Sequence, residues 1–117
     1  MTAQIELTIA NGAAVSNGVD LRNLLVCGII TPSSWTAANL TFRGAAGVQD
    51  GVSAGTYQDV YDADGTELNV VAAASRHIVV SPSAFAGIQY LQVRSGTTGT
   101  PVNQGAARTL YLVCRSE

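Results

Sequence analysis

The chain has 117 residues, of which 47% are hydrophobic and 12% are charged, and its formal net charge is −2 at pH 7. This length and apolar content predict a single folded domain, residues 1–117, whose core needs neither a metal nor a disulfide to be stable. The six cationic residues are all arginines scattered along the chain, so the sequence lacks the clustered positive charge that nucleic-acid binding requires. No run approaches the roughly 20 apolar residues of a transmembrane helix, and we expect neither nucleic acid nor a membrane as a partner.

The low charge also indicates what kind of surface the protein has. Soluble proteins are usually about 25% charged, so Ala, Gly, Thr, Ser and Asn must cover part of the surface here. Such a surface suits a protein that lies against other proteins. The first residues, MTAQIELTIANG, lack the basic and apolar regions of a secretory signal, so we expect synthesis in the cytoplasm.

Strand patterns dominate the first half of the chain. Ile5, Leu7 and Ile9 alternate with polar residues, which predicts a strand with one solvent-facing side. Residues 21–30, LRNLLVCGII, form a nearly continuous apolar run. As a strand, this run should be covered on both faces.

The next alternating segment places Leu40 and Phe42 on its inner face. Thr41 and Arg43 then face outward, where an arginine is either solvated or paired with an acidic residue of a neighbouring protein. A glycine-rich segment follows at residues 47–56, and its composition predicts a mobile loop.

Residues 57–71 have the pattern of a β-hairpin, with arms at 57–61 and 67–71 and an Asp-Ala-Asp-Gly turn at 62–65. We expect aspartate in this turn to accept backbone N–H bonds and glycine to adopt a positive φ. Adventitious calcium binding is the alternative. An EF-hand loop, however, has its glycine at position 6 and helices on both sides, whereas here the glycine is fourth and the flanks are strands.

Three more strands are predicted at residues 76–81, 88–95 and 107–115, with a tight turn near Pro82. The alternation in the last two strands gives one set of inward residues: Leu91, Val93, Leu110, Leu112 and Cys114. It also gives an outward set: Tyr90, Gln92, Arg94, Thr109, Tyr111, Val113 and Arg115.

Taken together, the chain has about eight predicted strands, frequent turns and no long helix. This pattern predicts an all-β fold, an antiparallel two-sheet β-sandwich that is jelly-roll-like.

Few residues offer a chemical centre. Cys27 and Cys114 lie in apolar runs and match no zinc-binding spacing, so we interpret them as buried thiols, with a disulfide between them as the alternative. His77 is the only histidine, and no local motif gives it a nucleophile as a partner. We therefore expect a surface or core side chain there, and no metal or cofactor site.

The acidic residues Asp59, Asp62, Asp64 and Glu67 invite comparison with the paired carboxylates of a glycosidase. Such an enzyme needs a deep cleft with aromatic platforms, and only 6% of this chain is aromatic. We expect a protein that is not an enzyme.

The aromatic residues raise a second class of function, carbohydrate binding. Trp35 and Tyr57 could stack on a sugar if both lay exposed on one edge of the sandwich. The alternative is that Trp35 closes one end of the sandwich beneath a loop.

A resemblance to known proteins lies in a set of short segments. WTAANLTF at residues 35–42 precedes the glycine-rich loop, TYQDVYD and a DGTE turn; FAGIQYLQVRSG at 85–96 and TPVNQGAARTL follow. Over roughly residues 32–115 the chain resembles small proteins encoded in the structural gene regions of tailed phages and prophages. It is also loosely similar to discoidin or galactose-binding-like jelly rolls, a likeness of fold alone.

The phage resemblance implies a virion structural protein, a capsid decoration (cement) protein on the outer capsid surface. Its implied partner is the major capsid protein, and it would bind as a symmetric homo-oligomer, with a trimer favoured. A tail-associated or receptor-binding carbohydrate module is the alternative.

For a cement protein we expect the contacts to come from the loops 44–56 and 96–107 and from residues 1–6 as an added strand. The partner-binding candidates are Thr2, Gln4, Arg43, Gln49, Asp50, Arg94, Thr97, Thr98 and Asn103. The long loop 96–107 has two interpretations. It either lies against a partner or only crosses from one sheet to the other.

Overall fold

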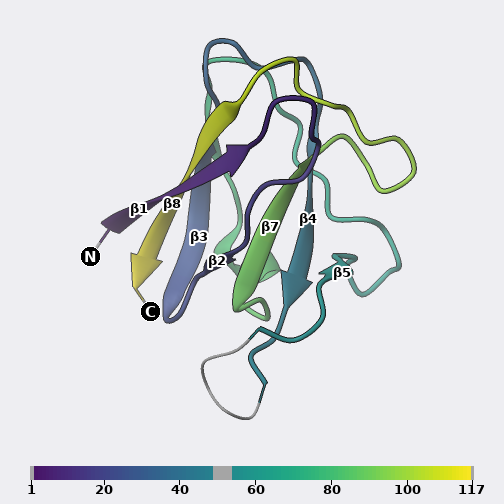
Figure 1. Cartoon of the computed structure of the whole chain (residues 1–117). Coiled ribbons are helices and arrows are strands. Elements are labelled where there is room, and N and C mark those ends of the chain that lie inside the picture. Colours follow the sequence, from purple (N-terminus) through teal and green to yellow (C-terminus); the bar gives the residue numbers. More distant parts are fainter. Residues whose placement is uncertain (1, 49–53, 117) are drawn as a thin grey trace.

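The computed structural model describes residues 2–48 and 54–116 (Figure 1). Its strands are β1 (Thr2–Ile9), β2 (Val19–Asp20), β3 (Leu24–Ile30), β4 (Leu40–Ala45), β5 (Gln58–Asp59), β6 (His77–Val79), β7 (Tyr90–Ser95) and β8 (Arg108–Ser116). A short 3-10 helix, η1 (Pro82–Phe85), forms the tight turn predicted near Pro82 and is the one helical element in this part of the chain. The all-β prediction is confirmed.

The strands form two four-stranded antiparallel sheets, with β1-β8-β3-β6 in sheet A and β2-β7-β4-β5 in sheet B. The first strand pairs with the last, the second with the seventh, the third with the sixth, and the fourth with the fifth. This is the pairing of one long hairpin rolled into two layers. The chain therefore has the jelly-roll arrangement that its sequence predicted.

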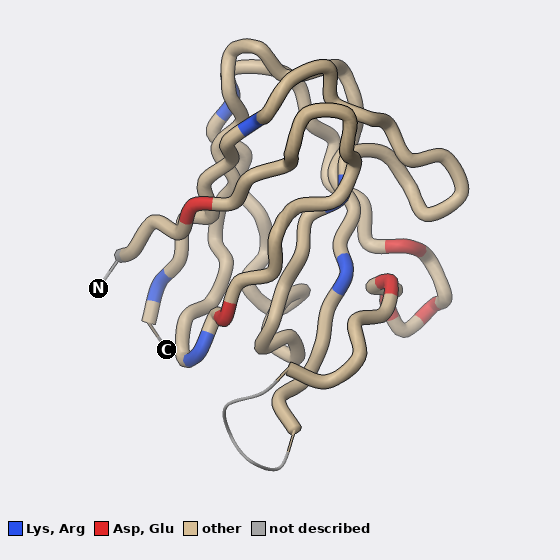
Figure 2. The backbone as a smooth tube through the Cα atoms, viewed as in Figure 1, with Lys and Arg blue, Asp and Glu red and all other residues tan. Residues whose placement is uncertain are grey.

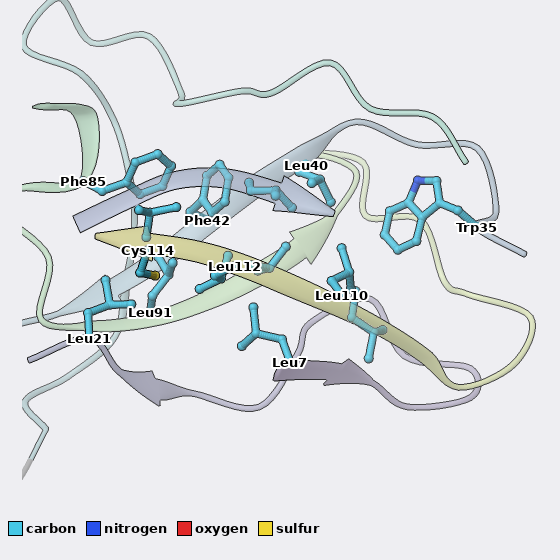
Figure 3. Close-up of a cluster of buried hydrophobic side chains, with 14 residues drawn as sticks. Leu7, Leu21, Trp35, Leu40, Phe42, Phe85, Leu91, Leu110, Leu112 and Cys114 are labelled. Atoms are coloured by element: carbon cyan, nitrogen blue, oxygen red, sulfur yellow. The ribbon is translucent and has the colours of Figure 1, made fainter. Parts of the chain in front are cut away.

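The core lies between the two sheets and is built from the alternating residues of the long strands (Figure 3). Leu110, Leu112 and Cys114 on β8 are fully buried, as predicted. From sheet B, Phe42 packs edge-to-face against Phe85 of η1, with ring centroids 5.1 Å apart. Pro82–Phe85 thus belongs to the core as well as to a turn.

Trp35 closes one end of this core. It is 6% exposed, and its indole Nε1–H donates a hydrogen bond to the carbonyl oxygen of Ala38 over 3.0 Å. Figure 3 shows the ring at the end of the cluster, beyond Leu110. Closure of the sandwich end is confirmed, and the buried indole offers no face on which a sugar could stack.

Strand β3 is shorter than the predicted strand 21–30, because the chain first makes a turn in which the Leu24 N–H donates to Leu21 O over 2.9 Å. Within the turn, Arg22 has a φ of 54°. The sequence also predicted that other segments cover both faces of this strand. Within the described chain that prediction is wrong, since Leu25 and Ile30 point away from the core and are only half-buried.

A β-bulge interrupts β3 at Cys27. Val26 is opposite Cys114, but Gly28 is opposite Val113, so Cys27 is an extra residue. Both cysteines are free: Cys114 is buried and Cys27 half-buried. Burial, followed by the nearby Cys27, raises the pKa of the Cys114 thiol to about 11, which keeps it unreactive at neutral pH.

The predicted hairpin is present with short arms. Tyr61 pairs with Glu67, and the Asp62 carboxylate accepts N–H bonds from Asp64 over 2.9 Å and Thr66 over 3.0 Å. Gly65 has a φ of 84°, a conformation that glycine adopts without strain. The structural interpretation of this turn is confirmed.

Candidate functional site

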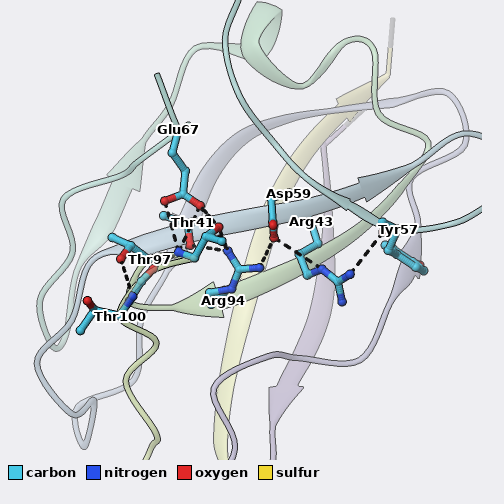
Figure 4. A network of polar contacts seen from close by, with 10 residues as sticks. Thr41, Arg43, Tyr57, Asp59, Glu67, Arg94, Thr97 and Thr100 are labelled. Atoms are coloured by element: carbon cyan, nitrogen blue, oxygen red, sulfur yellow. Dashed lines mark hydrogen bonds and ion pairs between the residues drawn. The ribbon is translucent and has the colours of Figure 1, made fainter. Parts of the chain in front are cut away.

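The outer side of sheet B carries a network of polar contacts centred on Arg94 (Figure 4). Arg94 lies on the predicted face of β7, but it is 5% exposed rather than solvated. One of its Nη atoms pairs with the Asp59 carboxylate, and the other lies 3.3 Å from Oε2 of Glu67. Arg94 thus faces outward from β7 as predicted, but it is neither solvated nor open to a neighbouring protein, because the hairpin covers it.

The same network fastens the loop 96–107 to the hairpin. The Thr98 N–H donates to Glu67 over 3.2 Å, and its hydroxyl donates to the same carboxylate. Beside it, Thr97 and Thr100 bond to each other in a tight turn, with Thr97 N–H to Thr100 O at 3.1 Å and Thr100 N–H to Thr97 Oγ1 at 3.0 Å. The tip of the loop is held by contacts within the chain.

The second half of the loop is held by Gln104, which is almost fully buried. Its Nε2 donates to Ser95 Oγ over 2.6 Å and to Thr36 O over 3.2 Å. Its Oε1 accepts the Thr36 N–H over 2.9 Å and Arg108 Nε over 3.2 Å. Sequence analysis missed Gln104, because a glutamine in a polar loop has the pattern of a solvated side chain.

Asp59 lies between two guanidinium groups, since Arg43 Nε is 3.7 Å from the carboxylate oxygen that Arg94 also contacts. The hydrogen bond from Arg94 is the main reason why the pKa of Asp59 is lowered. Arg43 also donates to Tyr57 O over 3.2 Å. The carboxylates of Asp59 and Glu67 are both engaged by Arg94, and the site is a neutral structural network.

The outer side of sheet A is different. We call the outward residues Leu25, Ile30, His77, Val79, Tyr111 and Val113, with Gly28 between them, the open face. The pairing register places Gly28 between Val113 and Val79, and Ile30 between Tyr111 and His77. Tyr111 and Val113 are half-buried, and Val79 is 84% exposed. An apolar row therefore crosses the middle of the sheet with no covering segment from the described chain.

Gly28 shapes the open face by lacking a side chain. A Cβ at this position would lie 3.0 Å from Nε2 of His77, so the glycine leaves room for the imidazole to lie on the sheet. His77 is exposed. The alternation of residues 107–115 correctly predicts that Tyr111 and Val113 face outward, but it does not predict that the face they share with β3 and β6 is apolar. Both sides of residues 109–114 carry apolar residues, which was the signal available.

The remaining sequence candidates are spread over the molecule. Thr2 and Gln4 lie on β1, at the edge of sheet A. Asn103 is exposed in the loop, and Gln49 and Asp50 fall outside the described residues. Arg43, Arg94, Thr97 and Thr98 are brought together on sheet B. The candidates therefore do not form one surface.

Tyr57, the second residue considered for sugar stacking, is half-buried. Its hydroxyl lies against Gly18. Burial, with smaller contributions from Tyr90 and Asp20, raises its pKa. Trp35 is buried in the core, so the two rings do not form an exposed aromatic pair.

A groove of about 740 Å³ opens at one end of the sandwich. Its lining residues are Asp20, Arg22, Asn23, Ala46, Ala86, Gly87, Ile88 and Gln89. The Asp20 carboxylate accepts the Arg22 N–H over 2.9 Å and so supports its left-handed backbone. These lining residues are polar or aliphatic, and none of them is aromatic.

No family model matches the sequence, and no curated protein or solved structure matches it. In the described ranges, no group of three or more His, Cys, Asp and Glu residues is placed to hold a metal ion. Within the same ranges, no helix has the length and hydrophobicity of a membrane span. The fold is that of a jelly roll, and a function must be argued from its surfaces.

Proposed function

We propose that the chain is a non-enzymatic structural protein of a phage virion, a capsid decoration (cement) protein that binds the major capsid protein on the outer surface of the shell. The observation that carries the proposal is the open face of sheet A. Its centre is apolar, and Val79 is 84% exposed. A face of this kind gains free energy when another protein covers it, at about 25 cal/mol per Å² of apolar surface buried.

The distribution of charge supports docking through this face. Figure 2 shows the arginines spaced along the chain, while acidic residues gather along the hairpin at residues 59–67; Glu6 lies on β1, at the edge of sheet A. Two of those carboxylates, Asp59 and Glu67, are already neutralised by Arg94 and Arg43 together. Covering the apolar row of the open face therefore strips few charges of water, a step that otherwise opposes binding.

The mechanism that we propose is clamping of subunit junctions. The long hydrogen-bonded strands and the fastened loop make a rigid body, so little conformational freedom is lost on docking. A protein that binds only the assembled shell stabilises it by mass action, on the order of 3 kcal/mol at a hundredfold excess over Kd. Jelly rolls recur in viral capsid domains and also in lectins, so the fold by itself does not separate these functions.

The test uses shells assembled from the major capsid protein of the phage that encodes the chain. Purified protein is mixed with shells and followed through a density gradient. We expect co-sedimentation, its loss in Val79→Asp, and its retention in Val71→Asp. Val71 is a matched control because it is 73% exposed and lies outside the open face. The proposal would be contradicted if wild-type protein did not sediment with the shells, or if both variants were retained on them equally.

A carbohydrate-binding module of a tail or receptor-binding protein is the second candidate, favoured by the polar groove beside Asp20 and Asn23. The lack of an aromatic platform in its lining speaks against it, since rings supply much of the stacking energy in sugar sites. A glycan array tests it directly. Saturable binding that Asn23→Ala abolishes, together with labelling of the virion tail in electron microscopy, would favour this function over cement.

A further inference from the structure

The four edges of the two sheets differ in length. Strands β2 and β5 have two residues each and β6 has three, whereas β1 has eight. Proteins usually protect long edges with lysine, proline or a bulge, because an open edge pairs with other strands. The β1 sequence TAQIELTI contains neither lysine nor proline, and its pairing with β8 runs through all eight residues without a bulge. Apart from the charge of Glu6, this edge has none of the usual protections.

The hydrogen bonds of Thr8 show which residues of β1 direct their backbone N–H and C=O groups away from β8. Its N–H donates to Asn17 Oδ1 over 2.8 Å, and its carbonyl accepts the Asn17 N–H over 3.3 Å, on the side away from β8. Alternate residues of a strand direct both backbone groups to the same side, so Gln4 and Glu6 share this direction. Within the described chain nothing bonds to those groups of Gln4 and Glu6. The part of the β1 edge with free backbone groups ends at Thr8, because Asn17 bonds to the N–H and C=O of that residue.

We propose that this edge pairs, antiparallel and about a two-fold axis, with β1 of a second copy. The two copies of sheet A then form one eight-stranded sheet. The proposal concerns the isolated protein and does not depend on its role in a virion. An edge-to-edge pair of identical strands closes with two copies, so the trimer expected from the resemblance would need a different surface.

The register of the β1–β1 pairing follows from which backbone N–H and C=O groups of β1 are free. A two-fold axis at Gln4 places the Gln4 residues of the two copies opposite each other, and Thr2 opposite Glu6, so that only unpaired groups are used. An axis at Ile5 sets Thr2 opposite Thr8, and an axis at Glu6 sets Gln4 opposite Thr8; in both cases this pair is lost, because Asn17 already bonds to the backbone groups of Thr8. An axis at Glu6 also sets two carboxylates face to face, which is destabilising. We therefore place the axis at Gln4.

A second copy also fits the chemistry of the exposed side chains. Gln4 is exposed, and an amide carries both donors and an acceptor, so two opposed glutamines complement each other. The Glu6 carboxylates of the two copies are kept about four residues apart along the strands, roughly 13 Å. The open faces of both copies then lie side by side on one continuous sheet.

The first experiment measures the oligomeric state of the full chain by sedimentation velocity over a range of concentrations. We expect a concentration-dependent dimer, retained in Gln4→Ala and lost in Gln4→Pro. Proline removes an N–H that points to solvent in the monomer, the one setting in which strands accept it. Circular dichroism and thermal unfolding check that the variant is folded. A monomer at every concentration, or a Gln4→Pro dimer as tight as wild type, overturns the proposal.

Two further variants make the outcome decisive. If Gln4→Pro does not fold, Gln4→Lys opposes two positive charges at the axis and should raise the dimer Kd roughly fivefold; an unchanged Kd overturns the contact. Under mild oxidation, Gln4→Cys should form a disulfide-linked dimer, because opposed residues lie about 5.5 Å apart. Glu6→Cys and the wild-type thiols should not. Cross-linking through Glu6→Cys instead overturns the register.

Discussion

The two sheets of this protein have outer sides of opposite character. The outer side of sheet B is closed: Thr41 is fully buried and Arg94 nearly so, because the hairpin and the loop 96–107 fold over them. The outer side of sheet A has no such cover in the described chain, and its middle is apolar. The few charges of the chain are therefore not spread evenly. Several of them fasten a cover onto one sheet, and the other sheet is left bare.

The largest effect should come from removing the cation that holds the cover. In Arg94→Met, Glu67 loses its cationic partner in a partly buried place, and Asp59 keeps only the longer ion pair with Arg43, at 3.7 Å. Breaking a buried pair in this way costs about 3–5 kcal/mol, which we expect to see in urea unfolding. The control is Arg22→Met, whose side chain is 82% exposed and should contribute less than about 0.5 kcal/mol. Equal effects of the two substitutions would contradict the closed-sheet description.

Acid should weaken the same cover to a smaller extent. The pKa of Asp59 is lowered in the folded protein, chiefly by the hydrogen bond from Arg94. Its contribution is therefore complete above the unfolded pKa of about 3.9 and is lost as the pH falls through the lower folded value. The free energy of unfolding, measured from pH 6 to pH 2, should fall less steeply below pH 4 in Asp59→Asn than in wild type. Identical slopes would show that the pair does not stabilise the fold.

The fastening of the loop can be tested at a single side chain, Thr98. Thr98→Val removes the hydroxyl that donates to Glu67 and accepts from Arg94 Nη1 over 2.7 Å, and it keeps the side-chain shape, so we expect a loss of about 1–2 kcal/mol. Faster amide exchange at residues 97–100 should accompany it. Thr100→Val is the control, since Thr100 takes part in the turn through its backbone. Unchanged slow exchange at the loop tip in Thr98→Val would mean that the Thr98 hydroxyl does not help to hold it.

The smallest effect is expected on the open side. Val79→Thr keeps a β-branched side chain at a position that is 84% exposed, and its unfolding free energy should stay within about 0.5 kcal/mol of wild type. Urea unfolding measures this as well. A loss above 1 kcal/mol would show that Val79 is covered in the isolated protein.

The sequence predicted the strands that depend on local alternation. Residues 88–95 and 107–115 show a period of two, and this fixes which side chains face the core whatever the neighbours are. The two-residue strands β2 and β5 leave no such pattern, because their pairing is imposed by β7 and β4. The arrangement into a jelly roll followed from the number and spacing of the strands.

The sites were harder to predict, because burial of an outward residue depends on distant segments. Arg94 lies on the face that its alternation predicts, yet it is covered by residues of a hairpin some 30 positions earlier. Gln104 has the local pattern of a loop residue and is buried by contacts with Thr36 and Ser95. The apolar run of β3 predicted that something covers both faces. It did not reveal that the described chain covers only one.

The bulge at Cys27 has a consequence for how β3 tolerates change. A strand that alternated without interruption would turn Gly28 toward the core and Ile29 toward water. This would leave a cavity in the core and an apolar side chain exposed to solvent. The extra residue shifts the inward–outward alternation by one position. Ile29 therefore packs in the core, and Gly28 faces outward, where it leaves room for the His77 imidazole. A deletion of Cys27 would remove the bulge and keep the later residues in the same phase, whereas a residue inserted beside it would keep that phase only by moving Gly28 and Ile29 two places along β8.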